Sequence, residues 1–108
     1  MALTVASSGI QSGSVGTEYV LSSGTAGTFQ FATDLANMQN GDWVTLRIKV
    51  ELSSGQPTKL LWQAVFVHNQ GNEPLLISPP FPAPVRFVAT LQQNSGTSRA
   101  FPWAIYSY

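Results

Sequence analysis

The sequence predicts an all-β fold, namely a single-domain antiparallel β-sandwich. Hydrophobic and polar residues alternate with a period of two through most of the chain after residue 28. Clusters of Gly, Pro and Asn separate these alternating stretches at short intervals, as in sandwiches and barrels. No long stretch has the period of an amphipathic helix. A chain of 108 residues is the size of one domain.

The N-terminal quarter differs in composition from the rest of the chain. More than half of residues 1–28 are Gly, Ser or Thr, and such small side chains bury little area against the entropy cost of ordering them. We therefore expect residues 1–27 to form an extended arm, with edge-type strands near residues 2–6 and 17–22, that is ordered when laid on a neighbour. Residues 28–108 are expected to form the sandwich.

The clearest predicted strand covers residues 43–52. Its even-numbered residues are all apolar, and the odd-numbered residues from 45 to 51 are Thr, Arg, Lys and Glu, which indicates one dry and one wet face. Residues 28–33 predict a strand before it, and Asp34 is suited to cap a single helical turn between the two. Asn40-Gly41-Asp42 supplies turn chemistry just before residue 43.

The second half of the chain predicts four more strands. Residues 59–68 are apolar on both faces, which is typical of a central strand or one covered on both sides. Residues 79–84 contain four prolines and must be a connection or an edge, because proline cannot donate to a strand ladder. Residues 74–78, 85–92 and 101–108 complete the set. With two strands in the arm the total is eight, which would permit a jelly roll, although one sequence does not give strand order.

The most unusual feature of the composition is its low charge. Only 9% of the residues are charged, against about 25% in ordinary soluble domains. A surface that spares charge in this way is suited to lie against other protein. The acids and bases are also unevenly placed, since residues 1–46 contain three acids and no Lys or Arg. Copies could therefore meet with opposite signs facing, or folding could mix the charges on one surface.

No constellation of catalytic residues is visible. The chain has no Cys and a single histidine, His68, so metal sites of the usual Cys and His types are not expected. The five acids are scattered, and no phosphate-binding loop, dinucleotide fingerprint or nucleophile elbow occurs. We expect no enzymatic activity, no cofactor, no metal and no small-molecule substrate.

Charge and hydropathy also bear on partners and location. The formal net charge is zero, which argues against nucleic-acid binding. No apolar run approaches the length of a membrane span, and the N-terminus does not resemble a signal peptide. The sequence therefore predicts a soluble protein that is made in the cytoplasm and binds neither nucleic acid nor membrane.

The remaining candidate site residues are exposed apolar and aromatic side chains suited to a protein interface. Trp62 and Trp103 share the phase of apolar neighbours and are expected in the core, whereas Trp43 is out of phase and Tyr106 lies opposite Trp103. This distribution argues against a single sugar-stacking platform. The candidate protein-interface residues are Leu3, Val5, Ile10, Trp43, Phe81, Tyr106 and Tyr108.

A series of ordered landmarks runs from about residue 27 to the end of the chain. They are Asp34-Leu35, Asn40-Gly41-Asp42, Leu52-Ser53-Ser54-Gly55, Glu73-Pro74, Ser78-Pro79-Pro80, Thr90-Leu91-Gln92-Gln93 and the run from Gly96 to Trp103. In this order and spacing the chain resembles a group of small virion proteins of tailed bacteriophages, encoded among head and structural genes.

The resemblance implies a virion structural protein, most like a capsid decoration (cement) protein. Such a protein would bind the phage major capsid protein on the outer surface of the head, after synthesis in the host cytoplasm, and stabilise the shell. It would be a homo-oligomer, either a dimer or a trimer. Two alternatives remain open: a head–tail connector or tail component, and a carbohydrate-binding β-sandwich module.

Overall fold

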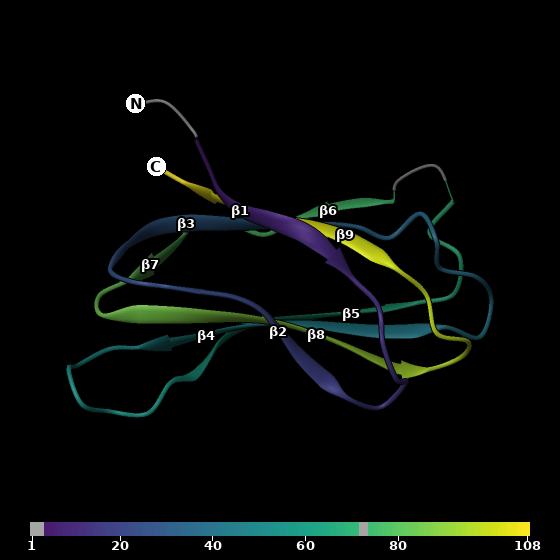
Figure 1. Ribbon diagram of the computed structural model, residues 1–108, viewed down its shortest axis with the longest axis horizontal. Helices are drawn as coiled ribbons and strands as arrows, with labels where there is room; N and C mark the ends of the chain where they lie inside the picture. The colour runs from purple at the N-terminus through teal and green to yellow at the C-terminus, as the bar shows by residue number, and fades with distance from the viewer. Residues whose placement is uncertain (1–3, 72–73) are drawn as a thin grey trace.

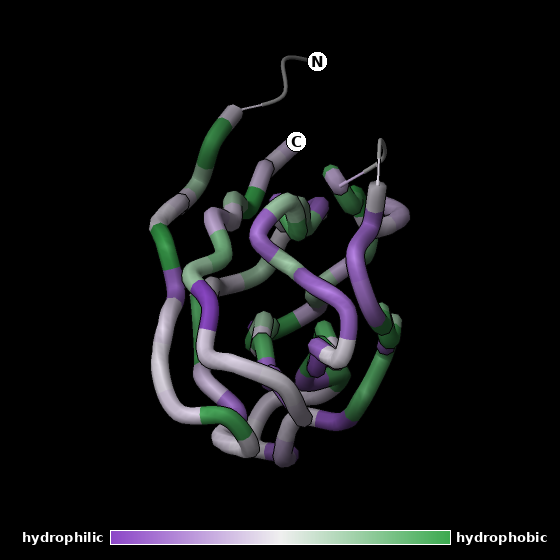
Figure 2. The backbone as a smooth tube through the Cα atoms, turned by 90° about the vertical axis from the view of Figure 1, so that its right-hand side faces the viewer, coloured by the Kyte–Doolittle hydropathy of each residue, from purple (hydrophilic) through white to green (hydrophobic). Residues whose placement is uncertain are grey.

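The computed structural model describes residues 4–71 and 74–108, and within them the chain forms two antiparallel sheets packed face to face (Figure 1). The predicted β-sandwich is confirmed. The strands are β1 (Thr4–Gln11), β2 (Glu18–Gly24), β3 (Gly27–Asp34), β4 (Trp43–Glu51), β5 (Lys59–Val67), β6 (Leu75–Ile77), β7 (Phe81–Ala83), β8 (Arg86–Ser95) and β9 (Phe101–Ser107). Seen along the strands, the backbone of the two sheets forms a closed outline (Figure 2).

The two sheets are built by a nested pairing of strands. Sheet A has the order β1-β9-β3-β6, with β7 also paired to β3, and sheet B has the order β2-β8-β4-β5. The first strand therefore pairs with the last, and the second strand pairs with the one before the last. β3 pairs with the broken strand formed by β6 and β7, and β4 pairs with β5. The chain folds as one long hairpin rolled into two layers.

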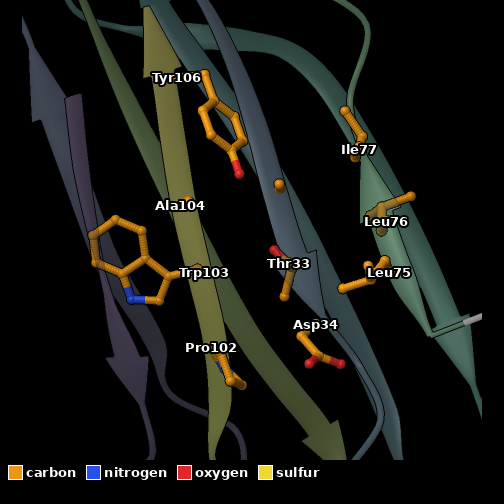
Figure 3. Close-up of a pocket in the computed structure, with 10 residues that line it drawn as sticks. Thr33, Asp34, Leu75, Leu76, Ile77, Pro102, Trp103, Ala104 and Tyr106 are labelled. Carbon is orange, nitrogen blue, oxygen red and sulfur yellow. The ribbon is translucent and has the colours of Figure 1, made fainter. Parts of the chain in front are cut away.

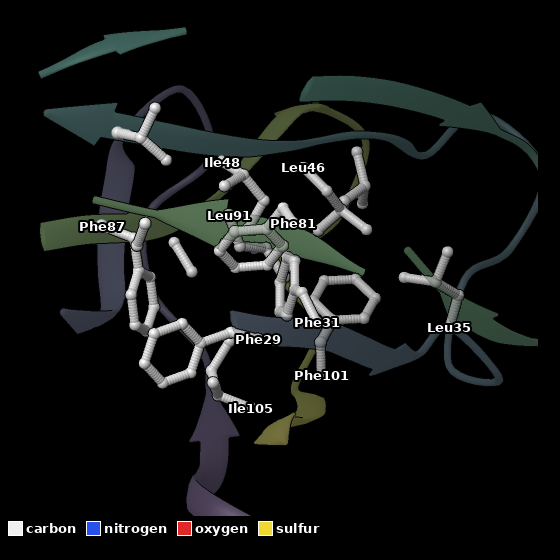
Figure 4. Close-up of a cluster of buried hydrophobic side chains, with 14 of the residues drawn as sticks. Phe29, Phe31, Leu35, Leu46, Ile48, Phe81, Phe87, Leu91, Phe101 and Ile105 are labelled. Atoms are coloured by element: carbon white, nitrogen blue, oxygen red, sulfur yellow. The ribbon is translucent and has the colours of Figure 1, made fainter. Parts of the chain in front are cut away.

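Phenylalanine rings dominate the core between the sheets (Figure 4). The rings of Phe29 on β3 and Phe87 on β8 have centroids 4.4 Å apart, and Phe81 packs edge-on against Phe87 at 5.5 Å. These contacts join sheet A to sheet B, because β3 and β7 belong to one sheet and β8 to the other. Burying such rings is a large part of the hydrophobic stabilisation of a small domain.

β4 has the inner apolar face that its sequence predicts, but its polar face is only partly open to water, because Thr45 and Glu51 are buried. Val44, Leu46 and Ile48 are fully buried against the opposite sheet, and Arg47 lies on the outer face between Gln63 of β5 and Thr90 of β8. The strand ends one residue earlier than expected, at Glu51, so Leu52 is exposed and does not join the core. Asp34 caps the turn that follows β3, as predicted, because its Oδ1 accepts a hydrogen bond from the Ala36 N–H at 2.9 Å, but this turn is not helical.

The N-terminal segment is part of the sandwich and not a separate arm. β1 is paired with β9 from Thr4 to Gln11, and β2 is paired with β8 from Glu18 to Gly24. Both are edge strands, as expected, but the edges they complete belong to their own chain. The small residues contribute to this packing, because Gly9 lies opposite Trp103 and leaves room for its indole ring.

β5 lies at the edge of sheet B, which differs from the central or covered strand that its sequence predicts. Its inner side chains Trp62 and Phe66 pack against the core, but the outer side chains of Val65 and Val67 are 45% and 48% exposed. β5 has apolar side chains on both faces, as the sequence indicates. No described residues of this chain pack over its outer face.

The proline-rich segment forms an edge of sheet A, as expected. Pro79 and Pro80 separate β6 from β7, and both short strands pair with β3. The expectation that Phe81 contributes to an interface is wrong, because its side chain is only 4% exposed and packs against both Phe29 and Phe87. Its neighbour Pro82 carries the exposed position instead.

Candidate protein-binding face

Charge is divided very unequally between the two sheets. The strands of sheet A contain one charged residue, Asp34, at the end of β3. The strands of sheet B contain six charged residues: Glu18, Arg47, Lys49, Glu51, Lys59 and Arg86. Nearly all of the charged strand residues therefore belong to sheet B, and the outer face of sheet A is almost entirely uncharged.

Many of the charges of sheet B neutralise one another. Glu18 Oε2 lies 3.2 Å from both Arg47 Nη1 and Lys49 Nζ, and it accepts a hydrogen bond from Thr90 Oγ1 at 2.6 Å. Desolvation raises the pKa of Glu18, but the Thr90 hydroxyl and the two cations outweigh it and hold the pKa below its ordinary value. This cluster joins an acid from residues 1–46 to two bases that follow residue 46, so folding mixes on one surface the charges that are separated along the sequence.

Asp42 forms a second neutralised cluster at one end of the sandwich. It is 1% exposed, and it accepts hydrogen bonds from the Gln39 N–H at 2.9 Å, the Thr97 N–H at 3.1 Å and Arg99 Nε at 2.9 Å. Burial raises the pKa of Asp42, but these donors outweigh it and leave the pKa below its ordinary value. Asp42 therefore holds loops together and is not presented to a ligand.

His68 belongs to the same end of the molecule and has a structural role. Its Nδ1 accepts a hydrogen bond from the Gly41 N–H at 3.0 Å, and its own N–H donates to the Asp42 carbonyl at 2.8 Å. These contacts hold it at a φ of 66°, which is uncommon for a residue other than glycine. Within residues 4–71 and 74–108, no group of three or more His, Cys, Asp or Glu side chains is arranged to hold a metal ion.

The outer face of sheet A is hollowed by a shallow groove of about 230 Å³ (Figure 3). Ala32 of β3 lies opposite Ala104 of β9, and these two small residues form its floor. Tyr106 borders it on β9, and Leu75 and Ile77 border it on β6. Leu75 and Ile77 are 70% and 57% exposed, so the wall of the groove is apolar and open to solvent.

Four of the predicted interface residues lie on this same face. Val5 pairs with Tyr106 across β1 and β9, and Ile10 pairs with Pro102. Val5 and Ile10 are 59% and 71% exposed. Tyr108 continues the row, because its hydroxyl hydrogen-bonds to Gln30 Oε1 at 2.6 Å.

The remaining candidates lie elsewhere. Trp43 is exposed, as expected, but it is on β4 in sheet B, so it does not share a surface with the tyrosines. Phe81 is in the core, and Leu3 falls outside the described residues. Sequence reasoning missed Leu75 and Ile77 as interface candidates. The signal was their period-two position around Leu76, but so short a strand does not reveal which of its faces is inward.

The side chains of Tyr106 and Tyr108 are held in place by contacts within the chain. Gln30 Nε2 donates to the Ser78 carbonyl at 2.8 Å while its Oε1 is bonded to Tyr108, so the hydroxyl is linked to the β6–β7 connection. Tyr106 is half-buried next to the groove. Rigid aromatic rings lose little conformational entropy on binding, which makes them efficient contacts. The face between β1 and β6 is therefore apolar, nearly uncharged and ordered; we call it the sheet A face.

Comparisons with family models, curated proteins and solved structures find no match to this chain. In the part of the chain that the structure describes, no helix is of the length and apolarity needed to cross a bilayer.

Proposed function

We propose that this chain is a virion structural protein of a tailed bacteriophage, a capsid decoration protein that binds the major capsid protein on the outside of the head and stabilises the shell. The observation that carries the proposal is the sheet A face, whose five strands contain only Asp34 as a charged residue. Such a face can cover shell protein without desolvating ions, which is costly.

The strand order supports the finer assignment of a jelly roll. With β6 and β7 counted as one strand interrupted by prolines, the chain has eight strands that pair first with eighth, second with seventh, third with sixth and fourth with fifth. This is the order of a rolled hairpin with two four-stranded sheets. Jelly rolls are common among viral capsid and lectin domains, but a fold alone does not assign a function. The sheet A face and the resemblance of the sequence landmarks make the proposal specific.

The two outer faces suit different surroundings. The outer face of sheet B carries Glu18, Arg47 and Lys49 in one cluster, which is compatible with water. Sheet A instead exposes the apolar side chains of Ile10, Leu75 and Ile77. On a shell, sheet A would face the capsid protein and sheet B would face the solvent. Many copies, each bound weakly, then add up to a stable coat through multivalency.

The carbohydrate-binding alternative has less support in the structure. Its exposed aromatic rings are divided between sheet B, with Trp43, and sheet A, with Tyr106 and Tyr108. They do not form one stacking platform. The head–tail connector remains the second structural reading, and the number of copies per particle distinguishes it from a decoration protein.

The test is cosedimentation of purified protein with expanded, empty phage shells. We expect wild-type protein to saturate the shells and the variant Ile77→Ser to bind at least about tenfold more weakly, since a buried apolar side chain contributes about 1.5–3 kcal/mol. The matched control is Val20→Ser, an equally exposed apolar residue of sheet B. If wild-type protein does not bind the shells, or if both variants bind as well as wild type, the proposal is wrong.

A further inference from the structure

β5 has the sequence of a central strand but lies at the edge of a sheet. From Trp62 to Val67 it contains no charged residue, no Pro and no Gly, and its outer residues Val65 and Val67 are nearly half exposed. No further strand lies beyond β5 in sheet B among the described residues. Its outward row of backbone N–H and C=O groups is a template that another β-strand can pair with.

The other edges of the sandwich carry features that discourage such pairing. β1 and β2 are each interrupted by a bulge, between Val5 and Ser7 and between Val20 and Ser22. The edge formed by β6 and β7 is interrupted by Pro79 and Pro80. β5 has its own protection only at its beginning, where Lys59 is charged and a bulge separates Leu60 from Trp62. The regular run from Trp62 to Val67 is left unprotected.

We propose that the β5 edge pairs with the β5 edge of a second copy of this chain, antiparallel and about a two-fold axis. The pairing is self-complementary. In the register centred on Ala64, Trp62 of one copy lies opposite Phe66 of the second copy on the inner face, and Gln63 lies opposite Val65 on the outer face. Apolar residues meet apolar residues on the inner face of the joined sheet, and such cross-strand pairs are stabilising.

Charge also favours the antiparallel arrangement over a parallel one. A parallel pairing in register would place Lys59 of one copy beside Lys59 of the other, which is destabilising. In the antiparallel pairing the two lysines lie at opposite ends of the joined strands. The resulting dimer has a continuous eight-stranded sheet B in which β5 is central, as its sequence predicts. An isologous dimer of this kind closes on itself and does not propagate into a filament.

The geometry of this dimer has a consequence that rests on the proposed function. A two-fold axis that relates antiparallel neighbours in one sheet runs perpendicular to that sheet. The outer faces of both copies of sheet A therefore point to the same side of the dimer, and both outer faces of sheet B point to the other. Two sheet A faces could then dock on one shell together, and the second contact would benefit from a high effective concentration. The dimer itself does not depend on this use.

The test measures self-association of the full chain in the absence of shells, by sedimentation equilibrium over a wide range of concentration. We expect wild type to form a dimer and Val65→Lys to dimerise at least about tenfold more weakly, because the new charges crowd the joint. The control is Val20→Lys, which places the same charge at an exposed valine on β2, the opposite edge of the same sheet. It should dimerise as wild type does. Circular dichroism checks that each variant is folded.

A cross-linking variant keeps the proposal falsifiable if Val65→Lys fails to fold. The chain has no cysteine, so Ala64→Cys introduces a single thiol at the centre of the proposed register. Directly opposite residues of antiparallel strands are close enough for a disulfide, and mild oxidation should yield a covalent dimer. The control Ser23→Cys, exposed on β2, should not. A monomeric wild type, a dimer unaffected by Val65→Lys, or equal cross-linking at both positions overturns the proposal. Shell binding by a monomeric protein would overturn the dimer alone, and a dimer that does not bind shells would overturn the proposed function alone.

Discussion

Arg99 Nε lies 2.9 Å from Oδ2 of Asp42, and this pair ties the approach to β9 to the turn that precedes β4. Fifty-seven residues separate the two in sequence. The Asp42 side chain is almost completely buried, whereas that of Arg99 is 29% exposed, so water screens part of the attraction. The hydrogen bonds from backbone N–H groups to the carboxylate are not screened in this way, which makes Asp42 the central residue of the loops.

The variant Asp42→Asn should therefore lose stability without losing volume. An amide N–H₂ group would face donors that now bind a carboxylate, and we expect the free energy of unfolding to fall by about 2 kcal/mol. Urea denaturation followed by tryptophan fluorescence measures the change. The control is Asp34→Asn, whose side chain caps an exposed turn and can still do so as an amide. Equal losses in the two variants would contradict the role assigned to Asp42.

Acid should weaken the fold through the same carboxylates. The pKa values of Asp42 and Glu18 are both lowered in the folded chain, so the native state binds fewer protons than the unfolded state in the acid range. Their contribution is complete above the unfolded values of about 4 and is lost as pH falls through the folded values. We expect the melting temperature to hold from pH 7 to 5 and to drop below about pH 4. The difference in melting temperature between wild type and Asp42→Asn should become smaller over the same pH interval. A difference that stays constant would contradict the role assigned to the Asp42 carboxylate.

The variant Thr33→Val should be more stable than the wild-type protein. Its Oγ1 is buried and has no hydrogen-bond partner among the described residues, so removing the hydroxyl removes a desolvated polar group and loses no bond. We expect Thr33→Val to raise the free energy of unfolding by about 1 kcal/mol. The matched variant is Thr45→Val, since the buried Thr45 hydroxyl donates to Asn94 Oδ1 at 2.6 Å. It should lower stability by about the same amount, and calorimetry would separate the two. Losses of similar size in both would show that the Thr33 hydroxyl is satisfied.

A methyl group at Gly24 tests whether β2 belongs to the folded core. A Cβ there would overlap the ring of Phe87, which is fixed by Phe29 and Phe81. Overpacking of this kind costs about 1–3 kcal/mol, and Gly24→Ala should show it in thermal unfolding. Ser23→Ala, next to it and exposed, should be nearly neutral. If Gly24→Ala is also neutral, the N-terminal segment is a loose arm as the composition alone suggested.

The sequence was informative where periodicity decides structure. The alternation from Trp43 to Glu51 predicted the inner apolar face of β4, and the prolines from Pro79 to Pro84 predicted an edge. It was misleading at the N-terminus, because composition measures how much area a segment can bury and not whether backbone pairing will hold it. β1 and β2 are stabilised by hydrogen-bond ladders with β9 and β8. Such long-range pairings cannot be predicted from the local sequence of β1 or β2.

The site was only partly predictable for a related reason. Tyr106 and Tyr108 were predicted at the surface from their phase, and Val5 and Ile10 were predicted as exposed apolar residues of the N-terminal segment. A sequence does not say, however, that β1, β9 and β3 are neighbours. Phe81 was misplaced because a single aromatic residue between prolines has no phase to read. The edge position of β5 was not predicted either, because a strand that is apolar on both faces is normally central or covered on both sides.

The most direct test of the proposed role is the number of copies of this chain per purified phage particle, measured by mass spectrometry against the major capsid protein as an internal standard. A decoration protein that coats the shell through its sheet A face should be present in hundreds of copies and should be released as shells are stripped. A dozen copies or fewer, or none, would contradict the account and would favour a connector or a protein outside the virion.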